Sequence, residues 1–225
     1  MEMMKQNLLI ACTALMCMFS HPVVAQQQPA GAPQQQPAGA ASQLPTSNTD
    51  ISPLLIGEQV PDVTLVGTDG KEHSLVSITK EKPTIIFFYR GKWCSNCIRH
   101  FSQEIAPHAA EIAALGYNIM NVAPDVPDSL IKTAQLTNLD PATFYSDGEG
   151  ALSKAMGVAV QQQERMLATL TAYSGGKNKG YLPVPAVYIL DINQKVLFMY
   201  INPMSPSDKL RIRGNFLMAV LGALK

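Results

Sequence analysis

The chain has 225 residues, of which 47% are hydrophobic and 15% charged, so it suits one domain with extra segments or two small domains and is not wholly disordered. Its 17 basic residues balance 17 acidic ones, which leaves no net charge to attract a polyanion and argues against nucleic acid as the main partner. Four cysteines are too few for a disulfide scaffold at this length, so the position of each one is informative.

The first segment, residues 1–25, is typical of a secretory signal peptide. Residues 8–19 are almost wholly apolar, but this run is shorter than the roughly 20 residues that a membrane-spanning helix needs. Small residues at Val23 and Ala25 predict cleavage after Ala25. We therefore expect an exported protein, periplasmic or secreted, with no stable membrane span after processing.

A lipoprotein is the alternative for this segment, because Leu9–Cys12 is similar to a lipobox with Cys12 as the lipidated residue. The apolar run continues beyond Cys12, which favours the simple signal peptide. In that case Cys12 and Cys17 are removed with the peptide, and the mature chain keeps only Cys94 and Cys97.

Residues 26–50 are predicted to be a flexible linker rich in Gln, Pro and Ala. The sequence QQQPAGA occurs at Gln26–Ala32 and again at Gln34–Ala40. It has no apolar periodicity and cannot bury a core. The folded domain is therefore expected to occupy residues 51–225.

The domain begins with a predicted β-hairpin, residues 60–66 and 72–75, around the turn at Thr68-Asp69-Gly70. Residues 84–89 are continuously apolar and β-prone, as expected of a central strand that is buried on both faces. A helix with apolar residues from Ile98 to Leu115 follows, and Pro107 predicts a kink or break in it.

The later elements continue the alternation of strands and helices. They are a strand at 117–122, a helix capped by Asp128 and ending near Leu139, a strand at 143–145, a helix at 151–156, a hairpin of strands 186–190 and 196–201, and a last helix capped by Ser207 or Asp208. This order predicts an α/β domain with a central mixed β-sheet flanked by helices on both faces.

One stretch, Gln161–Tyr181, is long and polar and has no clear helix or strand pattern. It leads directly into Pro185 and carries Gly175-Gly176. We therefore expect a mobile flap that borders the active site and shapes substrate access.

The pair Cys94 and Cys97 follows the buried strand and lies at the predicted start of a helix. The partial positive charge of a helix N-terminus favours a thiolate, which is the form that attacks disulfides and peroxides. Cys94 at the cap is expected to be the more exposed sulfur, and Arg90, Lys92 and Arg99 add positive charge nearby. This context favours a redox-active pair.

Two other interpretations of the cysteine pair are weaker. A zinc site completed by His100 or His108 is disfavoured because the ligand spacing is not a standard one, so no metal is expected. An inert structural disulfide is disfavoured because so short a loop stabilises little. His100 and Glu104 are expected to be a surface or half-buried histidine and a solvated helix residue.

The segment Phe87–Cys97, FFYRGKWCSNC, resembles the FYRGxWCxxC segment of the peroxiredoxin-like branch of the AhpC/TSA (alkyl hydroperoxide reductase/thiol-specific antioxidant) family. Gly57–Asp62, Phe144–Asp147 and Pro185–Asp191 are similar to other segments of the family or of related thioredoxin-like reductases. The resemblance implies a thioredoxin-like fold, which agrees with the predicted order of elements.

The chain departs from the peroxiredoxin pattern, Pro-x-x-x-Thr-x-x-Cys. In this comparison Cys97 has the peroxidatic position, Cys94 the position of the Thr, Arg90 that of the Pro, and Pro185 that of a second Arg which orients peroxide. Most of the usual peroxide-binding set is therefore absent.

The thioredoxin pattern fits better, because Trp93 precedes the pair and Pro185 follows Val184. In that family this proline is cis and faces the cysteines, and the backbone of the preceding residue pairs with an extended substrate. Trp93, Arg90, Val184 and Pro185 are thus the expected supporting residues of the site.

The resemblance implies a thiol–disulfide oxidoreductase in which Cys94 attacks a protein or small-molecule disulfide and Cys97 resolves the mixed disulfide. The alternative is a thiol peroxidase that reduces hydroperoxides, with Cys97 peroxidatic and Cys94 resolving. A non-catalytic binding module on the same fold is a further alternative. Either enzyme needs a thiol electron donor, and no cofactor motif is present.

Overall fold

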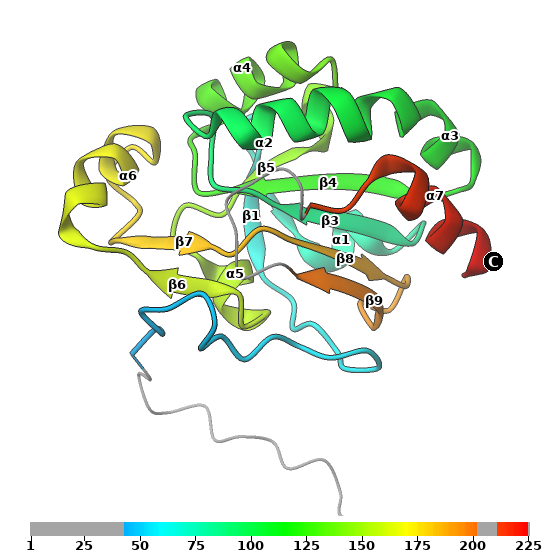
Figure 1. Cartoon of the computed structure of the whole chain (residues 1–225), viewed down its shortest axis with the longest axis horizontal. Helices are drawn as coiled ribbons and strands as arrows, with labels where there is room; N and C mark the ends of the chain where they lie inside the picture. Colours follow the sequence, from blue (N-terminus) through cyan, green and yellow to red (C-terminus); the bar gives the residue numbers. More distant parts are fainter. Residues whose placement is uncertain (1–42, 202–210, 225) are drawn as a thin grey trace, which may run out of the picture. The chain divides into compact units, whose positions relative to one another are not determined.

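A computed structural model describes residues 43–201 and 211–224 (Figure 1). The predicted signal peptide, most of the linker, Ser207 and Asp208 lie outside these ranges. Within the described residues, seven strands form a central sheet in the order β2-β1-β5-β4-β3-β8-β9. Their bounds are Thr64–Gly67 for β1, Glu72–Ser74 for β2, Thr84–Phe88 for β3, Asn118–Ala123 for β4, Phe144–Ser146 for β5, Ala186–Leu190 for β8 and Val196–Ile201 for β9.

The sheet is mixed, as predicted. β3 runs parallel to β4, and β4 parallel to β5. The β1–β2 and β8–β9 hairpins add antiparallel strands at the two edges, and β8 is antiparallel to β3. The β-prone segment that is predicted to be central is β3, and all five of its residues are buried.

Alternate side chains of β3 enter two separate cores because successive residues of a strand face opposite sides of the sheet. Ile85 and Phe87 belong to the core on one face, and Ile86 and Phe88 to the core on the other. The first core is covered by α2 (Ser95–His100), α3 (Ala109–Ala114), α4 (Pro127–Thr137) and α7 (Gly214–Ala223), and the second by α1 (Leu75–Thr79) and α5 (Ala151–Ala155) (Figure 1). The prediction that helices cover both faces is confirmed.

The helix after the cysteine pair is interrupted near Pro107, as expected. After α2 the chain forms a π-helical turn, η1 (Phe101–Ile105), and a 3₁₀ turn, η2 (Ala106–His108), before α3. Proline has no backbone N–H to continue the α-helical pattern. The departure from α-helix begins at Phe101, six residues before the proline.

Helix α4 differs from its prediction at the N-terminus. Its cap is Val126 and Pro127 is the first helical residue, so Asp128 lies in the first turn and does not cap the helix. Proline suits this place because the N–H it lacks would have no partner within the helix. The helix ends at Asn138, whose φ of 55° is left-handed.

The polar stretch Gln161–Tyr181 contains ordered elements that the sequence pattern does not reveal. β6 (Ala159–Gln161) pairs with β7 (Tyr181–Pro183) in a separate two-stranded sheet. Between them lie the 3₁₀ turn η4 (Glu164–Met166) and α6 (Leu167–Tyr173). These elements are short and show no clear periodic pattern in the sequence, and α1 and the 3₁₀ turn η3 (Pro141–Thr143) are not predicted either.

Candidate active site

Cys94 and Cys97 form a disulfide across the first turn of α2. Cys94 is the N-cap residue, and its carbonyl accepts the hydrogen bond of the Cys97 N–H at 2.9 Å. The two Cα atoms are 5.3 Å apart. Cys94 is 8% exposed and Cys97 is completely buried, so the expectation that Cys94 is the more accessible sulfur is confirmed.

The loop that presents the pair begins at the end of β3. Gly91 has a φ of 125°, which residues other than glycine rarely adopt, and its carbonyl accepts the Cys94 N–H at 3.0 Å. The Arg90 guanidinium lies 5.0 Å from the centre of the Trp93 ring, a cation–π contact. Partial burial lowers the pKa of Arg90 from its ordinary value. Arg90 and Trp93 therefore form one wall beside Cys94.

Asp125, in the loop after β4, fixes the loop that carries the cysteines, a role that no sequence motif indicates. Its carboxylate accepts a 2.7 Å hydrogen bond from the Lys92 backbone N–H. Burial raises the pKa of Asp125 to about 6, although the hydrogen bond from Lys92 opposes this rise. β3 and β4 are parallel, so their C-terminal ends meet at one edge of the sheet. An acidic residue just after the apolar segment 117–122 is the signal available in the sequence.

Pro185 reaches the same edge through the pairing of β8 with β3. Phe88 lies opposite Ala186, which puts Pro185 beside the start of the Arg90–Cys94 loop. The backbone N–H of Val184 donates a 2.8 Å hydrogen bond to the Val158 carbonyl. The Val184 N–H therefore has a partner within the chain. Of the backbone groups of Val184, only the carbonyl is left to pair with an extended substrate, and that pairing stays a prediction.

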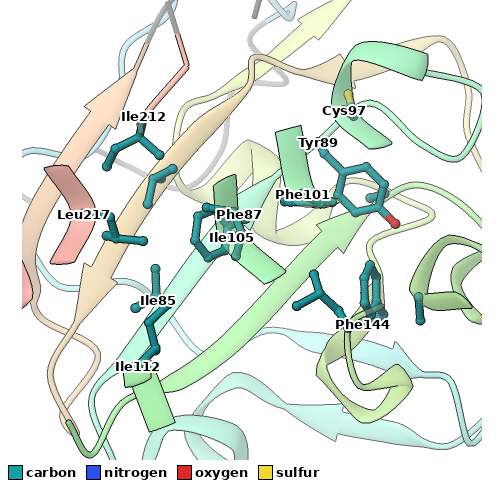
Figure 2. Packing of buried hydrophobic residues seen from close by; sticks show 14 of the residues in the cluster. Ile85, Phe87, Tyr89, Cys97, Phe101, Ile105, Ile112, Phe144, Ile212 and Leu217 are labelled. Carbon is teal, nitrogen blue, oxygen red and sulfur yellow. The ribbon is translucent and has the colours of Figure 1, made fainter. Parts of the chain in front are cut away.

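Aromatic rings belong to the same buried core as Cys97 (Figure 2). In Figure 2 the Tyr89 ring lies between Cys97 and Phe144, and Phe101 belongs to the same core. The ring centroid of Tyr89 lies 5.1 Å from that of Phe101 and 6.2 Å from that of Phe144, both edge-on. Edge-on packing of this kind stabilises buried aromatic pairs beyond their contact area. These rings therefore stabilise the core that contains the buried sulfur.

A segment from the C-terminal part of the chain contacts the buried sulfur. Arg211 Nη2 lies 3.5 Å from Cys97 Sγ, although 114 positions separate the two residues. His100 Nε2 lies 2.8 Å from the Ile212 carbonyl, so this nitrogen donates the hydrogen bond. His100 is only 6% exposed, which corrects the expectation of a surface or half-buried histidine. No motif in the sequence points to Arg211.

Glu104 binds the same segment one turn further along. Its carboxylate accepts a 3.0 Å hydrogen bond from the Gly214 N–H and pairs with the Arg213 guanidinium. Partial burial alone would raise the pKa of Glu104, but the contacts with Gly214 and Arg213 hold it below its ordinary value. Glu104 thus attaches the residues before α7 to the active-site helix, which corrects the expectation of a merely solvated residue.

A small pocket of about 20 Å³ lies at this edge of the sheet. Its lining is mainly apolar and aromatic, with Arg211 and His100 as polar members, and includes Tyr89, Phe101, Pro185, Tyr200 and Ile212. In residues 43–201 and 211–224, no three His, Cys, Asp or Glu side chains gather in a way that could hold a metal ion. No helix within these ranges has the length and apolarity to cross a membrane.

Comparison with protein families gives one match that covers most of the domain. A family model described as "AhpC/TSA family" matches residues 56–199. The chain is also 31% identical over 84 residues to a protein of Haemophilus influenzae described as "Thioredoxin-like protein", which corresponds to 35% of this chain and 47% of the relative. The match thus spans about half the length of that curated relative.

Solved structures of peroxiredoxins share the fold at low sequence identity. Peroxidoxin BcpB from Mycobacterium tuberculosis is 19% identical, with a TM-score of 0.59 over 76% of this chain and 97% of the other. Reduced Prx3 from Vibrio vulnificus, in complex with hydrogen peroxide, is 16% identical, with a TM-score of 0.60 over 75% and 99%. A peroxiredoxin-like protein from Aquifex aeolicus is 19% identical, with a TM-score of 0.58 over 77% and 90%. The predicted thioredoxin-like fold is confirmed.

Proposed function

Because the chain belongs to the AhpC/TSA family, whose members are thiol-based oxidoreductases and peroxidases, we propose that it is a thiol–disulfide oxidoreductase that cycles between the Cys94/Cys97 dithiol and its disulfide. The observation that carries this function is the difference in exposure within the disulfide. Cys94 reaches the surface and Cys97 does not. A substrate sulfur can approach only an accessible partner, so Cys94 is the attacking residue and Cys97 the resolving one.

The reaction takes place in two exchange steps. The Cys94 thiolate attacks one sulfur of the substrate disulfide, the substrate S–S bond breaks, and the first substrate sulfur leaves as a thiolate. The Cys97 thiolate then attacks Cys94 Sγ and displaces the second. Two electrons pass from the dithiol to the two substrate sulfurs, and the two protons of the dithiol end on the product thiols. An external thiol donor restores the dithiol by the reverse exchange.

The roles proposed for the supporting residues depend on where these residues lie relative to Cys94. Trp93 and Arg90 form the wall beside Cys94 and would contact the part of the substrate next to the reacting sulfur. Pro185 borders the pocket at the same sheet edge. The Val184 carbonyl is the backbone group left to pair with an extended substrate, since the Val184 N–H is bonded to Val158.

A second candidate function is that of a thiol peroxidase. The contact between Arg211 and Cys97 Sγ favours it, because a guanidinium beside a sulfur stabilises the thiolate that attacks peroxide. Cys97 would attack one oxygen of the hydroperoxide to give a sulfenic acid and release the alcohol or water. The Cys94 thiol would then condense with the sulfenic acid, forming the disulfide and releasing one water.

We propose that the protein carries out this activity outside the cytoplasm. Residues 1–25 are proposed to direct the chain to the periplasm or the exterior, where protein and small-molecule disulfides persist. The protein would maintain redox balance there, as an antioxidant, and would depend on a thiol electron donor. Recovery of a mature N-terminus at Gln26 from the exported fraction would test this proposal, whereas recovery at Cys12 would indicate a lipoprotein.

Single-turnover kinetics on the full chain separates the two activities. Cys12→Ser and Cys17→Ser leave only the site cysteines, and the single tryptophan, Trp93, adjoins Cys94 and reports oxidation by fluorescence. The reduced protein and its Cys94→Ser and Cys97→Ser variants are mixed with a model disulfide or with hydrogen peroxide. For the reductase we expect fast disulfide reduction and a mixed disulfide trapped on Cys94 in Cys97→Ser.

The other outcomes have separate meanings. Fast peroxide oxidation that survives Cys94→Ser would support the peroxidase with Cys97 as the reacting sulfur. Slow reaction with both oxidants would overturn both enzyme functions and favour a non-catalytic binding module.

A further inference from the structure

Arg211, three residues before α7, contributes a charged group to the cysteine pair that the family patterns in this sequence do not predict. Arg211 approaches Cys97 from a different segment than Arg90, and its Nη2 atom lies 3.5 Å from the sulfur. Cys97 has no exposed surface, so little water reaches this sulfur to screen the interaction. A positive charge at this distance acts more strongly on a thiolate than on a neutral thiol or disulfide sulfur.

Three contacts attach the residues that follow Arg211 to the helical segment that carries Cys97. The Ile212 carbonyl accepts from His100, the Gly214 N–H donates to Glu104, and Arg213 pairs with Glu104. His100 and Glu104 lie on α2 and η1, the helical segment that also carries Cys97. The segment 211–214 is therefore bound to the helical segment that carries Cys97. Its position along that segment brings the Arg211 guanidinium close to the Cys97 sulfur.

We propose that Arg211 is a further catalytic residue, which stabilises the Cys97 thiolate and thereby the reduced dithiol, and that His100 and Glu104 act as positioning residues for it. This inference rests on the proposed dithiol function and deepens it. In the resolving step the Cys97 thiolate attacks Cys94 Sγ, so a larger thiolate fraction speeds release of product. A stabilised reduced form also makes the couple a stronger oxidant.

The other ionisable groups around the pair are engaged elsewhere or lie on other sides. Arg99 donates to Asn96, Asp125 accepts from the Lys92 backbone, and Arg90 stacks on Trp93. The ionisable side chains on the segments that border the pair are Tyr89, Arg90 and Lys92 from β3 and its loop, Arg99, His100 and Glu104 from α2 and η1, Asp125 from the loop after β4, and Arg211 and Arg213 before α7; of these, Arg211 is the one with a contact to Cys97 Sγ.

The test measures the ionisation of Cys97 without any substrate. In the full chain, Cys12→Ser, Cys17→Ser and Cys94→Ser leave Cys97 as the single thiol, and its ultraviolet thiolate absorbance is followed against pH. Adding Arg211→Gln should lower the thiolate-to-thiol ratio roughly tenfold at a given pH, and Arg211→Lys should restore part of it. Arg99→Gln is the matched control, because it removes a guanidinium from an exposed position of the cysteine helix and should leave the ratio unchanged.

A second measurement uses both cysteines, in equilibrium with reduced and oxidised glutathione. Arg211→Gln should shift this equilibrium roughly tenfold towards the protein disulfide. Arg213→Gln, which loosens the segment and leaves Arg211 in the chain, should shift it less in the same direction. Circular dichroism checks that each variant folds. If Arg211→Gln does not fold, the shift measured for Arg213→Gln tests the proposal in its place.

Two results would overturn the proposal. One is that Arg211→Gln, or Arg213→Gln in its place, leaves the thiolate-to-thiol ratio of Cys97 unchanged. The other is that Arg99→Gln lowers this ratio as much as Arg211→Gln does, which would mean that any nearby positive charge has the same effect. Neither readout needs a turnover substrate. A chain that reduces neither disulfide nor peroxide would refute the proposed function while leaving this result intact.

Discussion

The Asp125 carboxylate accepts a hydrogen bond from the backbone N–H of Lys92 at 2.7 Å, and this bond joins the loop after β4 to the loop that carries the cysteine pair. Asp125 is buried, with 1% of its residue surface exposed. The hydrogen bond from Lys92 thus fixes the loop that carries the cysteine pair. Burial of the Asp125 carboxyl group, however, is unfavourable for its ionised form.

Asp125→Asn should stabilise the protein above pH 6 and lose this advantage near pH 4. The folded-state pKa of Asp125 is raised from 3.8 to about 6, so the folded state binds the proton more tightly and its stability falls as pH rises through this window. Asparagine keeps an acceptor for the Lys92 N–H and carries no charge. The gain at pH 7 is at most about 3 kcal/mol. Urea unfolding at pH 4, 5, 6 and 7 measures it.

Glu81→Gln is the control for this series, since Glu81 is exposed. It should give the same unfolding free energy as the parent at every pH. A destabilised Asp125→Asn variant at pH 7 would contradict the expected sign and would mean that the ionised carboxylate is needed to hold the loop.

Gly91→Ala should strongly destabilise the loop that carries the cysteine pair. A Cβ at this position would lie 2.5 Å from the Asp125 carboxylate and 2.9 Å from the Trp93 indole nitrogen, at a φ of 125°. The backbone strain and the collision together should cost on the order of 3 kcal/mol. Thermal unfolding gives the loss of stability. The rate at which dithiothreitol reduces the Cys94–Cys97 disulfide shows whether the loop conformation has changed.

Gly70→Ala separates strain from collision. Gly70 also has a positive φ, 75°, but a Cβ added there would have no atom within 4 Å. The substitution should cost only about 1–2 kcal/mol and leave the rate of disulfide reduction unchanged. Equal losses for the two variants would show that the contact with Asp125 and Trp93 has no effect.

Phe101→Ala should remove much of the aromatic packing in the core that contains Cys97. Phe101 is 2% exposed and packs edge-on against Tyr89, Phe87 and Phe144. Loss of a buried phenylalanine side chain costs about 3–5 kcal/mol. The midpoint of urea unfolding measures this loss, and Phe216→Ala, at a position that is 50% exposed, is the matched control. A loss below about 1 kcal/mol would show that the neighbouring rings close the cavity.

Helix α6 should exchange its backbone amides faster than β3. Leu170 is the single buried residue of α6, whereas every residue of β3 is buried. Segments with few buried contacts open at lower free energy. Hydrogen exchange followed by mass spectrometry compares the two. Protection of α6 equal to that of β3 would refute the mobile flap expected over Gln161–Tyr181.

The hairpins and the strand-helix order are predictable because their signals are local. The hairpin of β8 and β9 is predicted with the observed bounds, and the continuous apolar run at 84–89 contains the central strand β3. Each depends on residues within a short window, where alternation, turn residues and branched side chains act directly on the backbone. β6, β7 and α6 are short and lie in or beside a polar stretch that shows neither alternation nor a helical period, so no local pattern predicts them.

By itself the sequence determined the cysteine pair and the strand-turn-helix that presents it, because Trp93, Cys94 and Cys97 lie within five consecutive residues and a bond between the two sulfurs depends on their spacing. Only the tertiary structure decided what surrounds the pair. Asp125 reaches the loop through the parallel pairing of β3 and β4, and Arg211 reaches Cys97 across 114 positions. Contacts of this range depend on how the strands and helices pack, which no local pattern encodes.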